Sequence, residues 1–336
     1  MHLSEFDYTL PEELIAQEPL AQRDTSRMIV VRMQNGAIEH RKFFEIGGYL
    51  KDDDLMVFND TRVVATRLYG HKETGGNVEA LLMKRLSQGV WEAMVKPGRR
   101  VGVGLKLIFD GGLVADVIER TEQGGRILQF HADTDPEELI ASAGQVPLPP
   151  YIHKRLDDPE RYQTVYASAD GSAAAPTAGL HFTPAILNEI RKRGIKTVFV
   201  TLHVGIATFR PVRTENIDDH EMHAESFEIT PQAAETINSA KGRIVCVGTT
   251  TARCLESAAV AKRKVRSGAG STRLFIRPGY EFKIVEAMVT NFHIPKSTLL
   301  VMVSALAGRQ IIKNAYQEAV KERYRFLSFG DAMFLC

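Results

Sequence analysis

Polar side chains follow three apolar segments in the second half of this 336-residue chain. They are His203 and Gly205 after residues 196–202, Gly248, Thr249 and Thr250 after residues 243–247, and Asn291 and His293 after residues 285–290. Each segment has the length and apolar character of a buried strand. Because ligands of open parallel sheets bind outside the carboxyl ends of the strands, we expect these side chains to share one crevice. Helix capping by the threonines and packing of the histidines are the alternatives.

A loop of small residues, 171–179, precedes His181. Its members, which include Thr177 and Gly179, have little side-chain bulk, so another molecule can approach the backbone closely. A helix is expected directly after Thr183, whose hydroxyl is a good N-cap, and the N-terminus of a helix attracts anions. We expect this loop to reach the same crevice; a tight packing loop is the alternative. An aromatic strand is expected before it, at residues 162–166.

Two further histidines lie in the stretch 220–223, HEMH. His220 and His223 are three positions apart, whereas the zinc motif HExxH places its histidines four apart on one helical face. We therefore expect no metal site; a zinc site that adds the three histidines named above is the alternative. With Glu225, these two histidines form a candidate acid–base group, because a carboxylate beside a histidine suits proton transfer. An ordinary loop carboxylate is the alternative for Glu225.

Positive charge is local in this chain, because 42 Lys+Arg against 41 Asp+Glu give a net charge of +1. Candidate contacts to a polyanion are Arg99 and Arg100 in the basic stretch 96–100, and Arg323, Tyr324 and Arg325 in the stretch 321–326. The second stretch interleaves aromatic rings with cations, a pattern suited to RNA. Solvated charged faces are the alternative for both stretches.

The chain divides into two regions that differ in the pattern of apolar and polar residues. Residues 63–150 hold about six short alternating runs separated by Gly-containing turns, which predicts a small antiparallel β-barrel or sandwich. Residues 151–336 alternate helical and apolar strand patterns, which predicts an α/β fold with a mostly parallel sheet and flanking helices. We expect residues 1–62 and 151–336 to form one discontinuous α/β domain and residues 63–150 to form an inserted barrel domain.

Cysteine usage and hydropathy indicate a cytoplasmic protein. Cys246, Cys254 and Cys336 lack metal-binding spacing, as is common in a reducing compartment, although Cys246 and Cys254 are a possible pair. No apolar run reaches the roughly 20 residues that span a bilayer. The first residues, 1–19, are acidic and lack the apolar core of a signal peptide. We expect no contact with a membrane.

Ten segments together resemble the S-adenosylmethionine:tRNA ribosyltransferase-isomerase family of queuosine biosynthesis. They are FDYTLPEELIAQEP (6–19), NDTRVVATRLYG (59–70), PLPPYI (147–152), ERYQTVYA (160–167), AAPTAGLHFT (174–183), TLHVGIATFRPV (201–212), DHEMHAE (219–225), VGTTTARCLES (247–257), VTNFHIPKSTLLVMVSALAG (289–308) and YRFLSFGDAMF (324–334). They run from end to end in the order of the family. One departure is Ala207, where the family usually has a second glycine, so the backbone approach there can differ.

The resemblance implies a reaction in which S-adenosylmethionine donates a ribosyl group rather than a methyl group. The implied acceptor is the aminomethyl nitrogen of 7-aminomethyl-7-deazaguanine (preQ1) at the wobble position of tRNA with a GUN anticodon. The implied product is epoxyqueuosine-tRNA, with adenine and methionine released. No metal or bound cofactor is implied, since S-adenosylmethionine is consumed as a co-substrate. A monomer and a β-barrel inserted in an α/β domain are also implied.

The implied chemistry gives the crevice residues expected roles. The base is His181 or His203, because both lie in small-residue loops that allow close approach. Arg210 and Arg253 are expected to pair with a carboxylate or a phosphate as planar forks. The remaining expected substrate contacts are Thr177, Gly179, Gly205, Thr208 and Gly248 in the loops, Thr249 and Thr250 for the methionine carboxylate or ribose, and Asn291 and His293 for the adenine or ribose.

Two other classes of protein compete with this interpretation. An α/β enzyme acting on a nucleoside without RNA would use the same crevice, and a tRNA-dependence assay separates the two. A non-catalytic RNA-binding module would consume no S-adenosylmethionine, and the density of His, Thr and Asn at the strand ends argues against it. A conventional methyltransferase is disfavoured, because no Gly-rich loop follows an early strand in the usual position.

Overall fold

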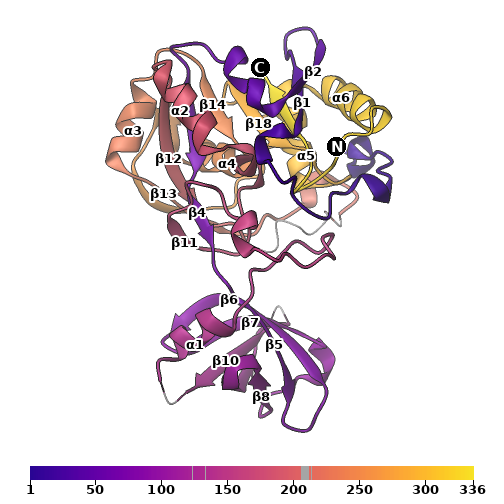
Figure 1. The fold of residues 1–336 in the computed structure, drawn as a ribbon, viewed down its shortest axis with the longest axis vertical. Helices are drawn as coiled ribbons and strands as arrows, with labels where there is room; N and C mark the ends of the chain where they lie inside the picture. Colours follow the sequence, from indigo (N-terminus) through magenta and orange to yellow (C-terminus); the bar gives the residue numbers. More distant parts are fainter. Residues whose placement is uncertain (123, 133, 206–211, 213) are drawn as a thin grey trace. The chain divides into compact units, whose positions relative to one another are not determined.

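The structure is a computed structural model that describes residues 1–122, 124–132, 134–205, 212 and 214–336. It divides into two compact units, drawn in Figure 1. The larger unit comprises Met1–Arg62 and Pro149–Cys336, and the smaller comprises Val63–Leu148. The sequence predicts that the barrel domain ends at Pro150. In the structure it ends at Leu148, and Pro149 and Pro150 belong to the larger unit.

A nine-stranded mixed sheet forms the centre of the larger unit. Its order is β17 (Gly268–Thr272), β13 (Glu225–Ile229), β12 (Lys196–Leu202), β3 (Leu55–Asn59), β14 (Ile244–Val247), β18 (Ala287–Asn291), β19 (Ala332–Leu335), β1 (Arg27–Val31) and β2 (Ile38–Lys42). The four strands β12, β3, β14 and β18 pair in parallel, as do β1 and β19, and the other pairs are antiparallel. The expected α/β class is confirmed, with the parallel pairing concentrated at the centre of the sheet.

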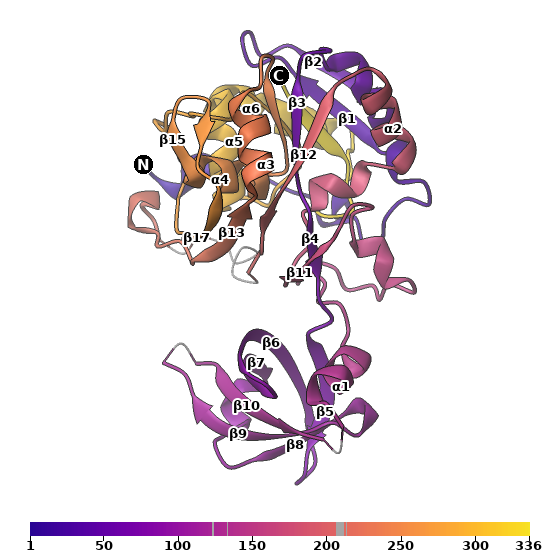
Figure 2. The ribbon, with the colours of Figure 1, turned by 90° about the vertical axis from the view of Figure 1, so that its left-hand side faces the viewer.

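Both faces of this sheet are buried at its centre, which explains why β14 is apolar on both faces. Side chains alternate between the faces: Ile244 and Cys246 of β14 join one core, and Val245 and Val247 join the other. Figure 2 shows helices on both sides of the sheet. They are α3 (Pro231–Asn238), α4 (Thr249–Ala258), α5 (Thr298–Ala307) and α6 (Arg309–Lys321) on one face, and α2 (Pro184–Lys192) with a 3-10 helix (Phe43–Tyr49) on the other.

Helix starts follow the sequence signals, but one strand prediction is wrong. The hydroxyl of Thr183 accepts a hydrogen bond from the backbone N–H of Ile186 at 3.3 Å and caps α2 as expected. Residues 162–166 form no strand. The segment Pro159–Tyr162 is a 3-10 helix, because Asp158 caps it by accepting from the N–H of Glu160 and because Pro159 fits a first helical position.

The smaller unit is a closed six-stranded antiparallel barrel, as expected. Its strands are β5 (Arg67–Lys72), β6 (Asn77–Ser87), β7 (Val90–Lys96), β8 (Lys106–Phe109), β9 (Val114–Arg120) and β10 (Arg126–His131), in the order β10-β7-β6-β5-β8-β9. Helix α1 (Pro136–Ala143) adds Ile140 to the barrel core. Closure leaves no unpaired sheet edge, which stabilises a core of this small size.

Two sequence expectations concern chemistry outside the site. Cys246, Cys254 and Cys336 are free, buried thiols, so the possible pair of Cys246 and Cys254 is not formed. Within the described part of the chain, no helix is both long enough and apolar enough to span a membrane.

Candidate functional site

A cavity of about 680 Å³ lies at the carboxyl ends of the parallel strands of the larger unit. Each of the three strands singled out from the sequence delivers residues to its wall. They are Val204 after β12, Gly248, Thr249 and Thr250 after β14, and Thr290 to Ile294 at the end of β18. Because strand β3 joins β12 to β14 in parallel, these ends meet at one edge of the sheet. The loop with Ala175, Pro176, Thr177 and Ala178 supplies a further wall.

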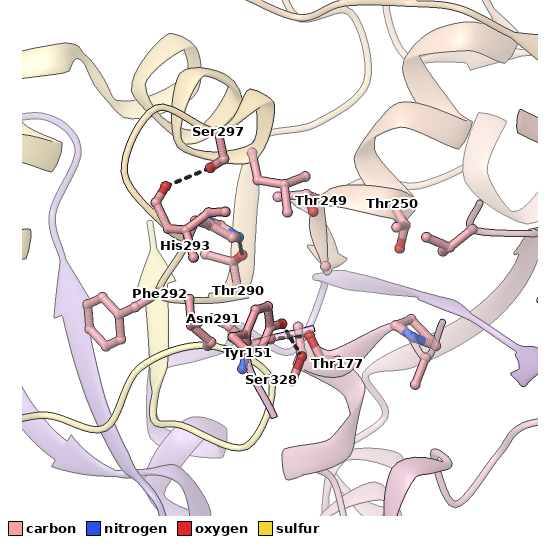
Figure 3. Close-up of a pocket in the computed structure, with 18 residues that line it drawn as sticks. Tyr151, Thr177, Thr249, Thr250, Thr290, Asn291, Phe292, His293, Ser297 and Ser328 are labelled. Atoms are coloured by element: carbon pink, nitrogen blue, oxygen red, sulfur yellow. Dashed lines mark hydrogen bonds between the residues drawn. The ribbon is translucent and has the colours of Figure 1, made fainter. Parts of the chain in front are cut away.

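A chain of hydrogen bonds fixes the side chain of Asn291 in this cavity, as Figure 3 shows in part. The hydroxyl of Thr177 donates to Asn291 Oδ1 at 2.8 Å. The amide of Asn291 donates to Nε2 of His181 at 3.2 Å, so Nδ1 of His181 carries the proton and donates to Ser26 Oγ at 2.8 Å. The ring of His181 also stacks on Phe43, with the centroids 4.9 Å apart. Both nitrogens of His181 are therefore occupied.

His181 is neutral at pH 7. It is 5% exposed, and burial, with the nearby positive charges of Arg325 and Arg23, lowers its pKa to about 4. Removing a cation from water is costly, so the neutral imidazole is the stable form in this position. His181 does not line the main cavity; it contacts the cavity through Asn291.

His293 is the second buried histidine, and its hydrogen bonds orient a threonine in the wall. The hydroxyl of Tyr316 accepts from the backbone N–H of His293 at 2.9 Å and donates to Nδ1 at 3.2 Å. Nε2–H then donates to Thr290 Oγ1, also at 3.2 Å, which leaves the proton of that hydroxyl available to a ligand. Burial lowers the pKa of His293 to about 3, so this side chain is neutral too.

The described wall of the cavity carries no Asp, Glu, Lys or Arg side chain. Its titratable side chains are His293 and Tyr151, and burial raises the pKa of Tyr151 to about 12. The phenol of Tyr151 lies 2.7 Å from the hydroxyl of Ser328, as Figure 3 shows. A cavity of this kind suits a neutral group with apolar faces and hydrogen-bonding edges, such as a nucleobase or a ribose.

The N-terminus of helix α4 opens into the same cavity. Gly248 precedes the helix with φ at +93°, a conformation that favours glycine, and Thr249 and Thr250 form the first turn. No side chain caps this helix, because Gly248 has none and the hydroxyl of Thr251 donates to the carbonyl of Val247 at 2.6 Å. The first backbone N–H groups are therefore free to bind an anionic group of a ligand.

The structure separates His203 from the cavity wall. His203 is not among the residues of the cavity wall, although its chain neighbour Val204 is. The hydroxyl of Thr61 lies 2.7 Å from Nδ1 of His203 and donates to the carbonyl of Ala169 at 3.4 Å, so Nδ1–H is the donor between them. Burial lowers the pKa of the half-buried His203.

The guanidinium of Arg253, expected to bind a substrate carboxylate or phosphate, pairs with a carboxylate of the protein itself. Arg253 and Glu225 form a buried ion pair, each 3% exposed at the side chain, and Glu225 also accepts from the N–H of Gly205 at 3.1 Å. Atoms Nε and Nη2 of Arg253 are buried and have no hydrogen-bond partner among the described residues. Arg253 is not part of the described cavity wall, and its expected contact with substrate stays a prediction.

Several predicted residues do not assemble into a site. His223 is exposed, His220 packs edge-on against Phe275, and Glu225 is engaged by Arg253, so no acid–base group of the expected kind forms. Gly179 lies outside the cavity wall in a 3-10 helix, Thr177–His181. Ala207, Thr208 and Arg210 lie outside the described residues. No group of three or more His, Cys, Asp or Glu side chains in the described chain is arranged to hold a metal ion.

The expected tRNA contacts differ in exposure. Arg99 and Arg100 lie on an exposed 3-10 turn of the barrel unit, and the side chain of Arg323 is 67% exposed. Tyr324 is 0% exposed, which corrects its expected contact with RNA. The centroid of its ring lies 5.7 Å from that of Phe292, and the guanidinium of Arg27 lies over the ring. Tyr324 therefore packs in the interior of the protein and offers no ring for RNA to stack on.

Sequence reasoning missed Tyr151, Thr290, Ser297 and Ser328 in the cavity wall. Tyr151 and Ser328 stand in matching segments of the family resemblance, but only their neighbours drew attention there. A single Ser or Tyr forms no motif and no periodic pattern, so the sequence does not mark it as a site residue. The structure brings these two together from positions far apart in the sequence.

Fold and cavity together define an α/β protein with a cavity that suits a nucleoside at the carboxyl ends of its parallel strands. Comparison with known proteins gives the family. Residues 3–335 match the model of a family described as queuosine biosynthesis protein, and the chain belongs to that family.

Full-length relatives agree with the family match. The chain is 54% identical over 340 residues to the S-adenosylmethionine:tRNA ribosyltransferase-isomerase of Symbiobacterium thermophilum and 53% identical over 340 residues to that of Pelotomaculum thermopropionicum, with 100% of each chain covered. A crystal structure of S-adenosylmethionine tRNA ribosyltransferase from Thermotoga maritima has 40% identity and a TM-score of 0.58, covering 99% of this chain and 100% of that one. These matches confirm the expected enzyme class, a transferase of tRNA modification in queuosine biosynthesis.

Proposed function

We propose that this protein transfers and isomerises the ribosyl group of S-adenosylmethionine onto preQ1 at the wobble position of tRNA with a GUN anticodon. The products are epoxyqueuosine-tRNA, adenine and methionine. We propose further that it acts in the cytoplasm as a monomer and needs no metal or bound cofactor. The free, buried thiols fit a reducing compartment.

The uncharged cavity of about 680 Å³ beside the α4 N-terminus is the observation that carries this proposal. S-adenosylmethionine joins a neutral nucleoside to a charged amino-acid end. Apolar side chains such as Phe292 and Leu299 suit the faces of adenine, and Asn291 and Thr290 suit its edge or the ribose hydroxyls. The free N–H groups at Thr249 and Thr250 suit the methionine carboxylate, because the helix N-terminus carries partial positive charge.

The reaction needs a base that removes a proton next to the sulfonium. Among the five acid–base candidates, His203 fits this role best, because it is the chain neighbour of Val204 in the cavity wall. Its Nδ1–H is held by Thr61, and Nε2 has no hydrogen-bond partner among the described residues, so Nε2 is the basic nitrogen. Because burial lowers the pKa of His203, the ring is neutral at pH 7 and able to accept a proton. His181 fits less well, because both of its nitrogens are engaged.

Three further transfers account for the protons and for the two leaving groups. Adenine leaves with the electron pair of its glycosidic bond and takes up one proton. Methionine leaves as a neutral thioether, keeping the electron pair of the broken carbon–sulfur bond. The aminomethyl nitrogen forms the new carbon–nitrogen bond and loses one proton. Neutral hydroxyls in the wall, Tyr151 and Thr290, are positioned to donate hydrogen bonds during these steps.

Adenine release tests the proposal. Purified protein is incubated with S-adenosylmethionine and tRNA that carries preQ1 at the wobble position, with the same tRNA carrying guanine as the control. We expect adenine only with the preQ1 tRNA. Adenine release without any tRNA would favour a nucleoside enzyme of the same cavity, and no release from folded protein would contradict the ribosyl transfer.

A further inference from the structure

A second cavity, of about 290 Å³, lies beside the first in the larger unit. Arg23, Arg161 and Ser26 contribute to its wall, as does His181, whose hydrogen bond to Asn291 leads to the main cavity. Ser328 lines both cavities. The two cavities are therefore neighbours, separated by the Asn291 and His181 side chains and sharing one serine.

The two arginines of this cavity are held in place without being neutralised. Each guanidinium donates to two backbone carbonyls: Arg23 to those of Gln163 and Glu160, and Arg161 to those of Ala21 and Leu20. Carbonyl oxygens orient a guanidinium but carry no net charge. Neither arginine has an ion pair among the described residues.

The nearby carboxylates are engaged elsewhere. Glu160 pairs with Arg62, and Asp158 accepts from the backbone N–H of Glu160 as a helix cap. On the other side, the carboxylate of Asp331 accepts from the backbone N–H groups of Arg27 and Arg325. Asp158 and Glu160 act on Arg23 only at a distance, and neither forms an ion pair with it, so its N–H groups are not covered by a carboxylate of the described residues.

A third guanidinium adds to this charge. Arg325 lies beside the cavity wall, because its guanidinium hydrogen-bonds to Glu18, the chain neighbour of Pro19 in that wall. Arg325 donates from Nη2 to the carbonyl of Glu18, and its Nη1 is buried without a hydrogen-bond partner among the described residues. Oriented guanidinium groups with unused N–H donors are suited to the tetrahedral oxygens of a phosphate.

We propose that this second cavity binds a phosphodiester group of the RNA substrate, next to the nucleotide that enters the main cavity. The inference rests on the proposed function, since it takes the anion to be part of tRNA. This phosphate contact explains how a protein with an uncharged main cavity binds a polyanionic substrate. The negative charge of the RNA is bound in the second cavity, beside the reacting groups. A phosphate contact here also fixes the position of the strand while the base is held out of its stack.

A single added charge in the cavity wall provides the sharpest test. Leu20 lines the cavity, is half-buried, and contributes only its backbone carbonyl to Arg161. Leu20→Glu places a carboxylate among the guanidiniums, and Leu20→Gln is the matched neutral control. We expect Leu20→Glu to bind tRNA about ten-fold more weakly than Leu20→Gln, because one phosphate contact is lost. The KM for S-adenosylmethionine is expected to stay unchanged.

A second pair of variants measures the salt dependence of binding. Arg161→Gln removes one cavity charge, and Arg191→Gln removes an exposed charge from α2 as the control. The slope of log Kd for tRNA against log salt concentration is expected to fall by about 1 for Arg161→Gln and to stay unchanged for Arg191→Gln. Circular dichroism checks that each variant is folded.

Two results would overturn the phosphate site. One is equal tRNA binding by Leu20→Glu and Leu20→Gln. The other is a rise in the KM for S-adenosylmethionine with tRNA affinity unchanged, which would make the cavity a carboxylate site for the other substrate. Failure of the proposed function is distinguishable, because wild-type protein would then bind tRNA but release no adenine.

Discussion

The side-chain amide of Asn291 donates to Nε2 of His181 at 3.2 Å, while Nδ1 of the same ring lies 2.8 Å from Ser26 Oγ. With both nitrogens engaged, His181 has no lone pair left for a substrate proton. Its position instead fixes the amide of Asn291, which lines the main cavity. His181 is therefore a positioning residue that acts through Asn291.

Two substitutions of His181 distinguish a positioning residue from a general base. His181→Gln retains an oxygen that can accept from Asn291, whereas His181→Phe keeps the ring against Phe43 but offers no acceptor. We expect His181→Gln to retain most of the adenine-release rate and His181→Phe to lose about ten-fold in kcat/KM for S-adenosylmethionine, roughly the value of one hydrogen bond. Steady-state kinetics measure both. A thousand-fold fall in kcat for both variants would instead identify His181 as the base.

Low pH is expected to destabilise the larger unit through its two buried histidines. The pKa values of His181 and His293 in the fold are about 4 and about 3, below the ordinary 6.5. Between pH 6.5 and 4 the unfolded chain binds more protons than the folded one, so stability rises with pH in that window and is complete above pH 6.5. Each histidine accounts for about 2 kcal/mol of the loss between pH 6.5 and 5.

Urea unfolding at pH 7 and pH 5 measures this loss. In the wild type, the difference in the free energy of unfolding between the two pH values has contributions from every titrating group. Comparison with His181→Phe isolates the contribution of His181. We expect the difference between the two pH values to be smaller by about 2 kcal/mol in the variant. Identical differences in both proteins would show that His181 does not titrate as stated.

Gly171 controls the position of His203. Its φ of +133° favours glycine, and a Cβ added there would lie 3.1–3.2 Å from three atoms of the His203 ring. Gly171→Ala is expected to displace this ring and to lower kcat at least ten-fold, since the proposed base would be misplaced. Gly268→Ala is the control: its φ is +110°, with nothing within 4 Å of the added Cβ. It should cost about 1 kcal/mol of stability and leave kcat unchanged. Equal kinetics for the two variants would contradict the role of His203.

The buried pair of Glu225 and Arg253 is expected to matter for stability. Glu225→Gln leaves the guanidinium of Arg253 buried without its charge partner, so we expect a loss of about 3–5 kcal/mol in the free energy of unfolding. Glu18→Gln breaks an exposed pair with Lys154 and should cost far less, because solvent screens that pair. Urea unfolding measures both, and similar losses in the two variants would refute the argument.

Local patterns in the sequence predict the elements well where burial is strong and regular. The residues of β14 are apolar on both faces because both faces are covered, and that pattern requires no knowledge of the neighbours. The six alternating runs of residues 63–150 likewise form the barrel. The strand expected at residues 162–166 fails because its aromatic residues, such as Tyr162, fill the core from a 3-10 helix and a turn.

Side-chain contacts across the fold are beyond such patterns. Basic and aromatic residues from 321 to 326 resemble an RNA contact, yet Tyr324 is buried against Phe292, which the local sequence does not reveal. Arg253 of helix α4 resembles a ligand fork, yet Glu225 of strand β13 pairs with it. In both cases the partner of the charged or aromatic group is decided by the packing of distant segments.

The sequence by itself determined the family, the α/β and barrel elements, and the gathering of Thr249, Thr250, Asn291 and His293 at strand ends, because these follow from local pattern and from strand direction. Only the tertiary structure decided which polar atoms remain free. It engaged both nitrogens of His181, held His203 through Thr61, and left Arg23 and Arg161 without an ion pair among the described residues. Hydrogen bonds and ion pairs join residues far apart in the chain, so their pairing exists only once the chain has folded.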